Sequence, residues 1–222
     1  MQLLSVNIGS PKHVDYTSAP ASITGIDKRP VTGPVAIASP GQERKGGSGV
    51  AGDTIGDQRV HGGNDQAVYA YAREDLDTWS RELGRELRDG AFGENLTTSG
   101  HDLGTARIGE RWRVGGDRGP LLEITGGRIP CRTFAGFLDE QGWVKRFTEA
   151  AVPGVYLRVL EPGDVAAGDA VEVVRRPDHD VTVELWFRAS TTQRELLPRL
   201  LPATDVLHHE TTDILRKAGL LD

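Results

Sequence analysis

Residues 156–174 read YLRVLEPGDVAAGDAVEVV, two β-type runs joined by a segment rich in glycine and proline. Branched and aromatic residues favour strands, whereas glycine and proline favour turns. The same alternation recurs along the chain, in LLSVNI (3–8), VAIA (35–38), LLEIT (121–125) and VTVELWF (181–187). Many short strands separated by turns predict a mainly β fold, a barrel or a sandwich, rather than a doubly wound sheet.

Two segments inside this β-rich part predict helices. In residues 73–87, Leu76, Trp79, Leu83 and Leu87 fall three or four positions apart and form one apolar stripe. The second helix is expected over roughly 133–150, with its phenylalanines on the apolar side. Both helices are expected to pack on the core rather than to carry chemistry.

The character of the chain changes after RRPDHD (175–180). Ser190 and Gln193 form a capping-box pattern before TTQRELLPRLL (191–201), which predicts a helix limited by prolines. A second helix fits DVLHHETTDILRKAG (205–219), with Gly219 as its stop signal. We therefore expect a main domain over 1–176 and a small extension over 177–222, a strand followed by helices.

Composition excludes several classes of protein. A formal net charge of −6 argues against a general nucleic-acid or membrane-surface binder, which needs a basic face. No apolar run approaches the about eighteen residues of a membrane span, and the first residues do not resemble a secretory leader. The single cysteine cannot form an intrachain disulfide, so a cytoplasmic protein is expected.

Two short motifs match known binding patterns incompletely. GQERKGGS (41–48) lacks the lysine that a phosphate-binding P-loop has before its last serine, so a flexible loop is the better interpretation. HETTD (209–213) has Asp213 where a zinc protease has its second histidine. Solvated side chains on a helix explain this second motif more simply than a metal does.

The densest polar segment is GDTIGDQRVHGGNDQAVYAY (52–71), which contains Asp53, Arg59, His61 and Asp65. Its glycines oppose a helix, so we expect a loop whose HGG forms a sharp turn before AVYAY. FGENLTT (92–98) places Glu94 and Asn95 after a glycine. Each segment fits either a hydrogen-bonded turn or a ligand site.

The lone cysteine, Cys131, lies in GGRIPCRTF (126–134), directly after Pro130 and between Arg128 and Arg132. A single cysteine is most often a small buried apolar residue. Nearby arginines lower the pKa of a thiol, and a thiolate is both a nucleophile and a soft metal ligand. Two further interpretations therefore remain open, a metal ligand and a nucleophile with His61 as its base.

Five segments occur along the chain in this order: K-R-P-V (28–31), the polar segment 52–71, F-G-E-N-L-T-T (92–98), R-x-P-C (128–131) and Y-L-R-V-L-E-x-G-x-V-x-x-G-D (156–169). Together they resemble the MOSC domain (molybdenum cofactor sulfurase C-terminal domain), and within it the YiiM-like branch. The resemblance covers most of residues 1–175, and it implies a β-barrel-like domain. The tail after about 177 is similar to the small helical extension of that branch.

The resemblance also implies a cofactor, the molybdenum cofactor (Mo-molybdopterin), a pterin dithiolene with a phosphate. The cysteine of R-x-P-C is the family's expected molybdenum ligand, which here is Cys131, and His61 and Asn95 follow it as expected catalytic residues. Arg128 would offset the negative charge around the metal. The residues expected to bind the cofactor are Lys28, Arg29, Asp53, Arg59, His61, Asp65, Glu94, Asn95 and Arg128.

The family suggests a molybdenum-dependent oxidoreductase that reduces small N-hydroxylated compounds, such as hydroxylamino purines, to amines. The sequence has no flavin fingerprint and no cysteines for an iron–sulfur cluster, so a separate reductase is expected to supply electrons. Pyridoxal phosphate, nucleic acid and membranes are not expected to bind. Two alternatives remain: a non-catalytic carrier of the cofactor or of sulfur, and a metal-free thiol hydrolase.

Overall fold

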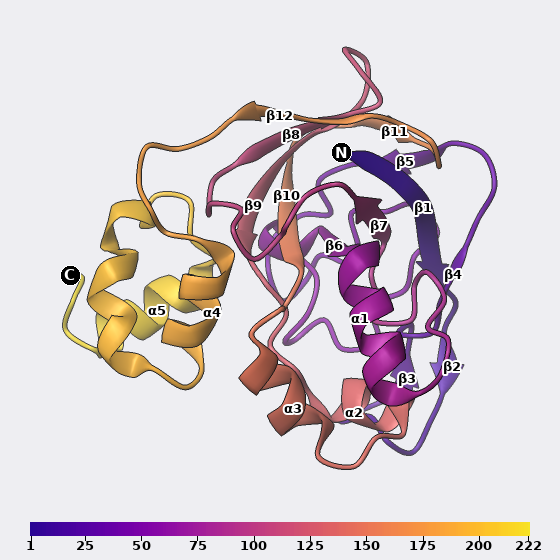
Figure 1. Ribbon diagram of the computed structural model, residues 1–222, viewed down its shortest axis with the longest axis horizontal. Coiled ribbons are helices and arrows are strands. Elements are labelled where there is room, and N and C mark those ends of the chain that lie inside the picture. The colour runs from indigo at the N-terminus through magenta and orange to yellow at the C-terminus, as the bar shows by residue number, and fades with distance from the viewer.

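The computed structural model describes residues 1–222 and is dominated by strands, with helices around them (Figure 1). The elements, in chain order, are β1 (Gln2–Gly9), β2 (Lys12–His13), β3 (Ile23–Thr24), β4 (Lys28–Pro30), β5 (Val35–Ile37), η1 (Asn64–Gln66), β6 (Val68–Ala72), α1 (Arg73–Leu83), β7 (Leu96–Ser99), β8 (Arg111–Val114), β9 (Leu121–Gly126), α2 (Arg132–Leu138), α3 (Trp143–Ala150), β10 (Val155–Glu161), β11 (Gly163–Val165), β12 (Val171–Arg175), α4 (Val183–Ser190), η2 (Arg194–Ala203) and α5 (His209–Lys217).

Eight strands form the main sheet, in the order β12-β8-β9-β10-β6-β7-β1-β4. All neighbours pair antiparallel except β6 and β7, which are parallel. The ladder is not closed, but Gln2 bridges Ala170, just before β12, and the Leu3 amide donates to the Asp169 carbonyl over 2.9 Å. Two distant parts of the sheet therefore meet, which confirms the expected mainly β, barrel-like fold.

The core is richest in aromatic rings where α1, α2 and α3 meet the sheet. Strand β6 is buried at every residue. Trp79 of α1, Phe134 of α2, and Trp143 and Phe147 of α3 gather around Phe92, with their ring centroids 5.1 to 6.3 Å from that of Phe92. Buried aromatic side chains contribute much of a core's stabilisation, so this cluster holds α2 firmly against the sheet.

Both helices expected in the main domain form, with different ends. The helix expected over 73–87 stops at Leu83, because Gly84 takes the left-handed conformation (φ 63°) that commonly ends helices. The segment 133–150 divides into α2 and α3, because Asp139 (φ 52°) and Gly142 (φ 70°) leave the helical region. Apolar spacing therefore located these helices but did not reveal the breaks.

The extension differs more from its prediction. VTVELWF (181–187), expected as a strand, lies mostly in α4, whose first turn is capped by the Thr182 hydroxyl accepting from the Leu185 amide over 3.1 Å. Ser190 is the last residue of α4 rather than a helix cap. The helix expected after it is a 3-10 helix, η2, which contains Pro198 and Pro202. The last helix, α5, forms as predicted and is followed by Gly219 in the left-handed conformation.

The extension packs closely against the main domain at the end of β9 (Figure 1). Arg107 bridges Thr182, and the Trp186 ring lies against Gly126, where a Cβ would be 2.9 Å from the ring. One hydrophobic cluster runs through both parts. The boundary at 176/177 stays a prediction. None of the helices combines the length and apolarity that crossing a bilayer requires.

Candidate functional site

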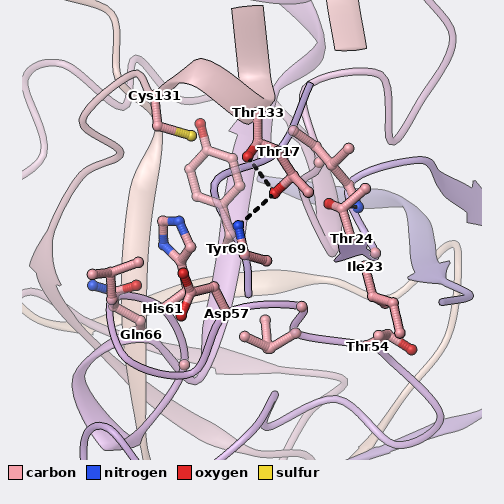
Figure 2. A pocket seen from close by; sticks show the side chains of 18 of the residues that line it. Thr17, Ile23, Thr24, Thr54, Asp57, His61, Gln66, Tyr69, Cys131 and Thr133 are labelled. Carbon is pink, nitrogen blue, oxygen red and sulfur yellow. Dashed lines mark hydrogen bonds between the residues drawn. The ribbon is translucent and has the colours of Figure 1, made fainter. Parts of the chain in front are cut away.

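A pocket opens between the ends of the strands and the loops that precede β4, β6 and α2 (Figure 2). It contains about 870 Å³ of empty space, which includes open solvent at its mouth. Figure 2 shows Cys131, His61 and Gln66 on one side of this space and Ile23, Thr24 and Thr54 on the other. We call it the first pocket.

The sequence brings Cys131 to this pocket through a short segment, residues 127–131, which we call the cysteine loop. It begins where β9 ends, and the Arg128 amide donates to the Pro153 carbonyl over 3.2 Å. Gly127 is required there, because a Cβ would lie 2.8 Å from the Gly154 carbonyl oxygen. Cys131 then caps α2, half-buried and with its sulfur free of any disulfide.

The environment of Cys131 favours its thiolate. Burial is the largest effect on its pKa and raises it, but hydrogen bonding to His61 and the charge of Arg128 outweigh it. The net result is a pKa of about 6, against an ordinary value of 9.0. At neutral pH the sulfur is therefore mostly ionised, which makes it a strong nucleophile and a good ligand for a soft metal.

Arg128 is a buried cation without a carboxylate partner. Its Nη1 donates to the Phe92 carbonyl over 2.8 Å, and its guanidinium lies 4.7 Å from the Phe134 ring centroid and 5.3 Å from that of Tyr69. Its Nε is buried and has no hydrogen-bond partner. A buried charge with an unused donor is costly unless something compensates it, so this residue favours an anionic ligand in the pocket.

Lys28, Asp53 and Asn95 form one buried network beside the pocket. Asp53 forms an ion pair with Lys28 and accepts from the Asn95 side-chain amide over 2.9 Å. The side-chain carbonyl of Asn95 accepts a hydrogen bond from the Tyr69 backbone amide over 3.2 Å. Burial lowers the pKa of Lys28 despite Asp53. Lys28 and Asn95 line the pocket, but Asn95 and Asp53 are already bonded to protein groups, so they position neighbours instead of offering free ligand atoms.

The structure directs Arg29 and Arg59 away from the expected cofactor contacts. Arg29 is exposed and pairs with Asp27 at 2.9 Å. Arg59 is exposed, pairs with Asp57 at 2.7 Å, and reaches the Ser18 carbonyl at 3.4 Å. Neither lines the first pocket, although Asp57 and Ser18 do. Each arginine is neutralised by an aspartate two residues before it, a short-range pairing that the motif pattern does not reveal.

Glu94 is also absent from the pocket. It is fully buried, accepts from the Phe92 amide over 2.9 Å and from the Thr97 hydroxyl over 3.0 Å, and so holds the turn before β7. Burial raises its pKa to about 7 in spite of these donors. These contacts give Glu94 a structural role, and its expected part in cofactor binding stays a prediction.

Asp65 lies at the junction with the extension. It pairs with Arg158 at 2.7 Å and accepts from the His209 amide over 2.9 Å. Asp65, His208 and His209 have potential ligand atoms within 4.8 Å of one another. Arg158 already neutralises the carboxylate, and His208 caps α5 by accepting from the Glu210 amide over 3.2 Å. This cluster therefore serves to hold the extension in place.

Several lining residues escaped sequence reasoning. The pocket gathers hydroxyl groups opposite the cysteine, and two of them, Thr17 and Thr133, lie 2.9 Å apart. Tyr69 and Tyr156 lie in two of the five motif segments, 52–71 and 156–169, and this position is the sequence feature that could have identified them. The threonines carried no signal. The other lining hydroxyl residues are Ser18, Thr24 and Thr54.

The residues present fit the molybdenum cofactor. An anionic dithiolene and phosphate need positive charge and hydrogen-bond donors, and molybdenum accepts a soft thiolate. The pocket supplies the Cys131 thiolate, the unused Nε of Arg128, the Lys28 ammonium and several hydroxyl groups. Of the expected residues, Cys131, His61, Arg128, Lys28 and Asn95 come together here.

Comparison with known proteins agrees with the motifs. The MOSC domain model matches residues 57–172. The chain is 32% identical to the uncharacterized protein YflK of Bacillus subtilis, over 84% of this chain and 79% of that protein. It is 32% identical to protein YiiM of Escherichia coli, over 61% and 60% of the two chains. It is 30% identical to a protein named reductase from Gibberella moniliformis, over 74% of this chain but 31% of that protein.

A solved structure shows the same fold. The crystal structure of YiiM from Geobacillus stearothermophilus matches with a TM-score of 0.76 over 97% of each chain, at 24% identity. The match includes the helical extension, because so little of either chain lies outside it.

Proposed function

Because this chain belongs to the MOSC domain family, we propose that it binds the molybdenum cofactor and reduces small N-hydroxylated compounds to amines, with electrons from a separate reductase. The observation that carries this proposal is the meeting, in one pocket, of a thiolate-forming cysteine and a buried arginine that has no carboxylate partner. The fungal relative named a reductase supports the reaction class.

The reaction adds two electrons and two protons to R–NH–OH, breaks the N–O bond, and yields R–NH₂ and water. The cofactor, when bound, supplies the two-electron chemistry that no side chain can provide. Cys131 would hold the metal through its sulfur. Arg128 would offset the negative charge of the cofactor, and Lys28, whose charge is balanced by Asp53, would add a hydrogen-bond donor at the same wall.

His61 has a separate task in this proposal. Its ring lines the pocket beside Cys131 and hydrogen-bonds to the thiolate when it carries a proton. A proton held there would be available to the oxygen that leaves as water.

A second candidate, a carrier of the cofactor or of sulfur, is favoured by one observation. The Cys131 sulfur lines an open pocket as a thiolate, which is the form that accepts a sulfur atom as a persulfide. Catalytic turnover separates the two candidates, because a carrier would bind the cofactor without consuming any substrate.

The test is molybdenum content by elemental mass spectrometry, in protein from a host that makes the cofactor. We expect near-stoichiometric metal in the wild type, and loss of most of it in Cys131→Ala and in Arg128→Met. Arg29→Met is the matched control, because it removes an arginine outside the pocket. Metal retained by Cys131→Ala would refute the ligand assignment, and no metal in the wild type would refute cofactor binding.

Turnover is tested next, with a chemical electron donor and hydroxylamine or 6-N-hydroxylaminopurine as substrate. Formation of the amine in the loaded wild type, and its absence in Cys131→Ala, is the expected result. A loaded protein that leaves every N-hydroxylated compound unchanged would favour the carrier. Ester hydrolysis that depends on Cys131 without molybdenum would favour the hydrolase.

A further inference from the structure

A second pocket lies where the extension meets the cysteine loop, with about 500 Å³ of empty space including open solvent at its mouth. The main domain contributes Val60, Gly127 and Ile129, and the extension contributes Trp186, Ser190 and Ile214. We call it the second pocket. None of the residues from the extension has a place in the proposed chemistry.

The two pockets are neighbours that share walls. Val60, His61, Gln66 and Tyr156 line both of them. The cysteine loop separates them, because Arg128 and Cys131 line the first pocket whereas Gly127 and Ile129 line the second. A molecule that reaches past His61 from the reacting centre therefore enters the second pocket.

The extension holds this second pocket in a fixed shape. The Trp186 ring lies on the backbone of Gly126, and its Nε1 donates to the Thr211 hydroxyl over 2.8 Å, which ties α4 to α5. The Asp65–Arg158 ion pair and the His209 amide anchor the start of α5 to the main domain. Preformed walls of this kind lower the entropic cost of binding a ligand.

Two residues that line the second pocket have a buried polar atom without a hydrogen-bond partner, Gln66 through its side-chain carbonyl and Ser190 through its hydroxyl. Ser190 is only 4% exposed, and its hydroxyl makes no hydrogen bond. Buried hydroxyls are nearly always satisfied, so an unsatisfied one that lines a pocket points to a ligand atom. Around it the wall is largely apolar, with Trp186, Ile214 and Ile129, the last of which is 44% exposed.

The charges of the two pockets differ. Lys28, Arg128 and Arg132 line the first pocket, with Asp57 as its one carboxylate. No lysine or arginine lines the second, which instead has Glu210. Burial and the neighbouring His209 lower the pKa of His208, so that ring adds no charge at neutral pH. Anionic ligands therefore prefer the first pocket, and an uncharged group with hydrogen-bond donors suits the second.

We propose that the second pocket binds the aromatic ring of the substrate, while the N-hydroxyl group lies at Cys131 and His61. The inference rests on the proposed function and adds to it a specificity site made by the extension. Ser190 would hydrogen-bond to a polar edge of the ring, Trp186 and Ile214 would pack on its faces, and Glu210 would favour N–H groups over acidic ones. The ligand class is an uncharged aromatic or heteroaromatic ring.

The experiment compares a substrate that fills the second pocket with one too small to reach it. Steady-state kinetics with 6-N-hydroxylaminopurine and with hydroxylamine are measured on loaded wild type, Ile214→Trp and Ser190→Ala. Ile214→Trp fills the pocket and should raise KM for the purine about tenfold or more, with kcat/KM for hydroxylamine unchanged. Ser190→Ala removes one hydrogen bond and should weaken the purine about three- to tenfold. Leu201→Trp, on η2 and outside both pockets, is the matched control.

A binding measurement separates this inference from the proposed function. Calorimetry with adenine, a ring with N–H donors and no reducible group, should show binding to the wild type that Ile214→Trp weakens. If the wild type binds adenine and Ile214→Trp does not, but the wild type reduces no N-hydroxylated compound, the proposed reaction is refuted and the second pocket remains a binding site for aromatic rings. Equal effects on hydroxylamine and the purine, or unchanged adenine affinity in Ile214→Trp, would refute the site. Loss of molybdenum in Ile214→Trp would also refute it, because the cofactor would then occupy the second pocket.

Discussion

The low pKa of the Cys131 thiol can be measured directly in cofactor-free protein, because no other cysteine competes for an alkylating reagent. The fall from 9.0 to about 6 corresponds to about 4 kcal/mol of preference for the thiolate. A thiol with that pKa is about 90% ionised at pH 7, against a few per cent for an unperturbed cysteine. The rate of alkylation by iodoacetamide, followed by intact-protein mass against pH, should rise with a midpoint near 6.

Two substitutions divide this effect between its causes. Arg128→Met removes the positive charge and should move the midpoint up by about 1–3 pH units, the usual effect of losing an opposite charge nearby. His61→Gln should move it in the same direction. Arg29→Met, whose charge is exposed and paired with Asp27, should leave it unchanged. A native midpoint at 8.5 or above, or one that ignores Arg128→Met, would refute the reasoning.

Three further substitutions test the fold around the pocket, each by chemical denaturation. Gly63→Ala should destabilise the protein by about 2–4 kcal/mol, because φ is +80° and a Cβ would lie 2.6 Å from the Glu43 Cα. Gly84→Ala is the control: its Cβ would meet open space, so it should cost only about 1 kcal/mol. Equal losses of stability in the two variants would contradict this prediction. Phe134→Ala should cost about 3–5 kcal/mol, because its ring is fully buried against the aromatic cluster, and a loss under 1 kcal/mol would contradict it. The pKa of Glu94 is raised from 4.5 to about 7, so between these pH values the native state binds more protons than the unfolded state, and stability should fall as pH rises through them. Glu94→Gln should remove that decline. An unchanged pH profile in the variant would exclude Glu94 as its source.

Sequence patterns were right for five of the six β-type runs named, because these alternate or are apolar between turn residues, but they did not identify most of the shorter strands. They were wrong for VTVELWF, since a short apolar run fits a buried strand or a buried helix equally well. Two contacts favour the helix over the strand: Thr182 caps α4, and Trp186 of α4 packs on Gly126. The breaks at Asp139 and Gly84 depend on single backbone conformations that periodicity does not record.

The candidate site was predictable where a motif combined chemistry with an unusual backbone. Cys131 and Arg128 stood out because a lone cysteine follows a proline between two arginines. Arg29, Arg59 and Glu94 belong to the same motifs but bond to partners that are close in the sequence, whereas Asp65 bonds to Arg158 and His209 from distant segments. A motif fixes a residue's neighbours in sequence and not the direction of its side chain. Thr17, Thr24 and Thr54 come from segments far from Cys131 in the sequence, so only the fold reveals that they line the same pocket.

The cysteine loop is a partition one residue thick, with neighbouring residues facing opposite compartments. Mutation of one face therefore cannot be independent of the other. A bulkier residue at Ile129 would press the backbone of Arg128 toward the first pocket, and a shift of Arg128 into the first pocket would reshape the second. Selection for a new ligand in one pocket would for this reason alter binding in the other, and compensating changes are expected in α4 and α5, whose side chains form the remaining wall of the second pocket.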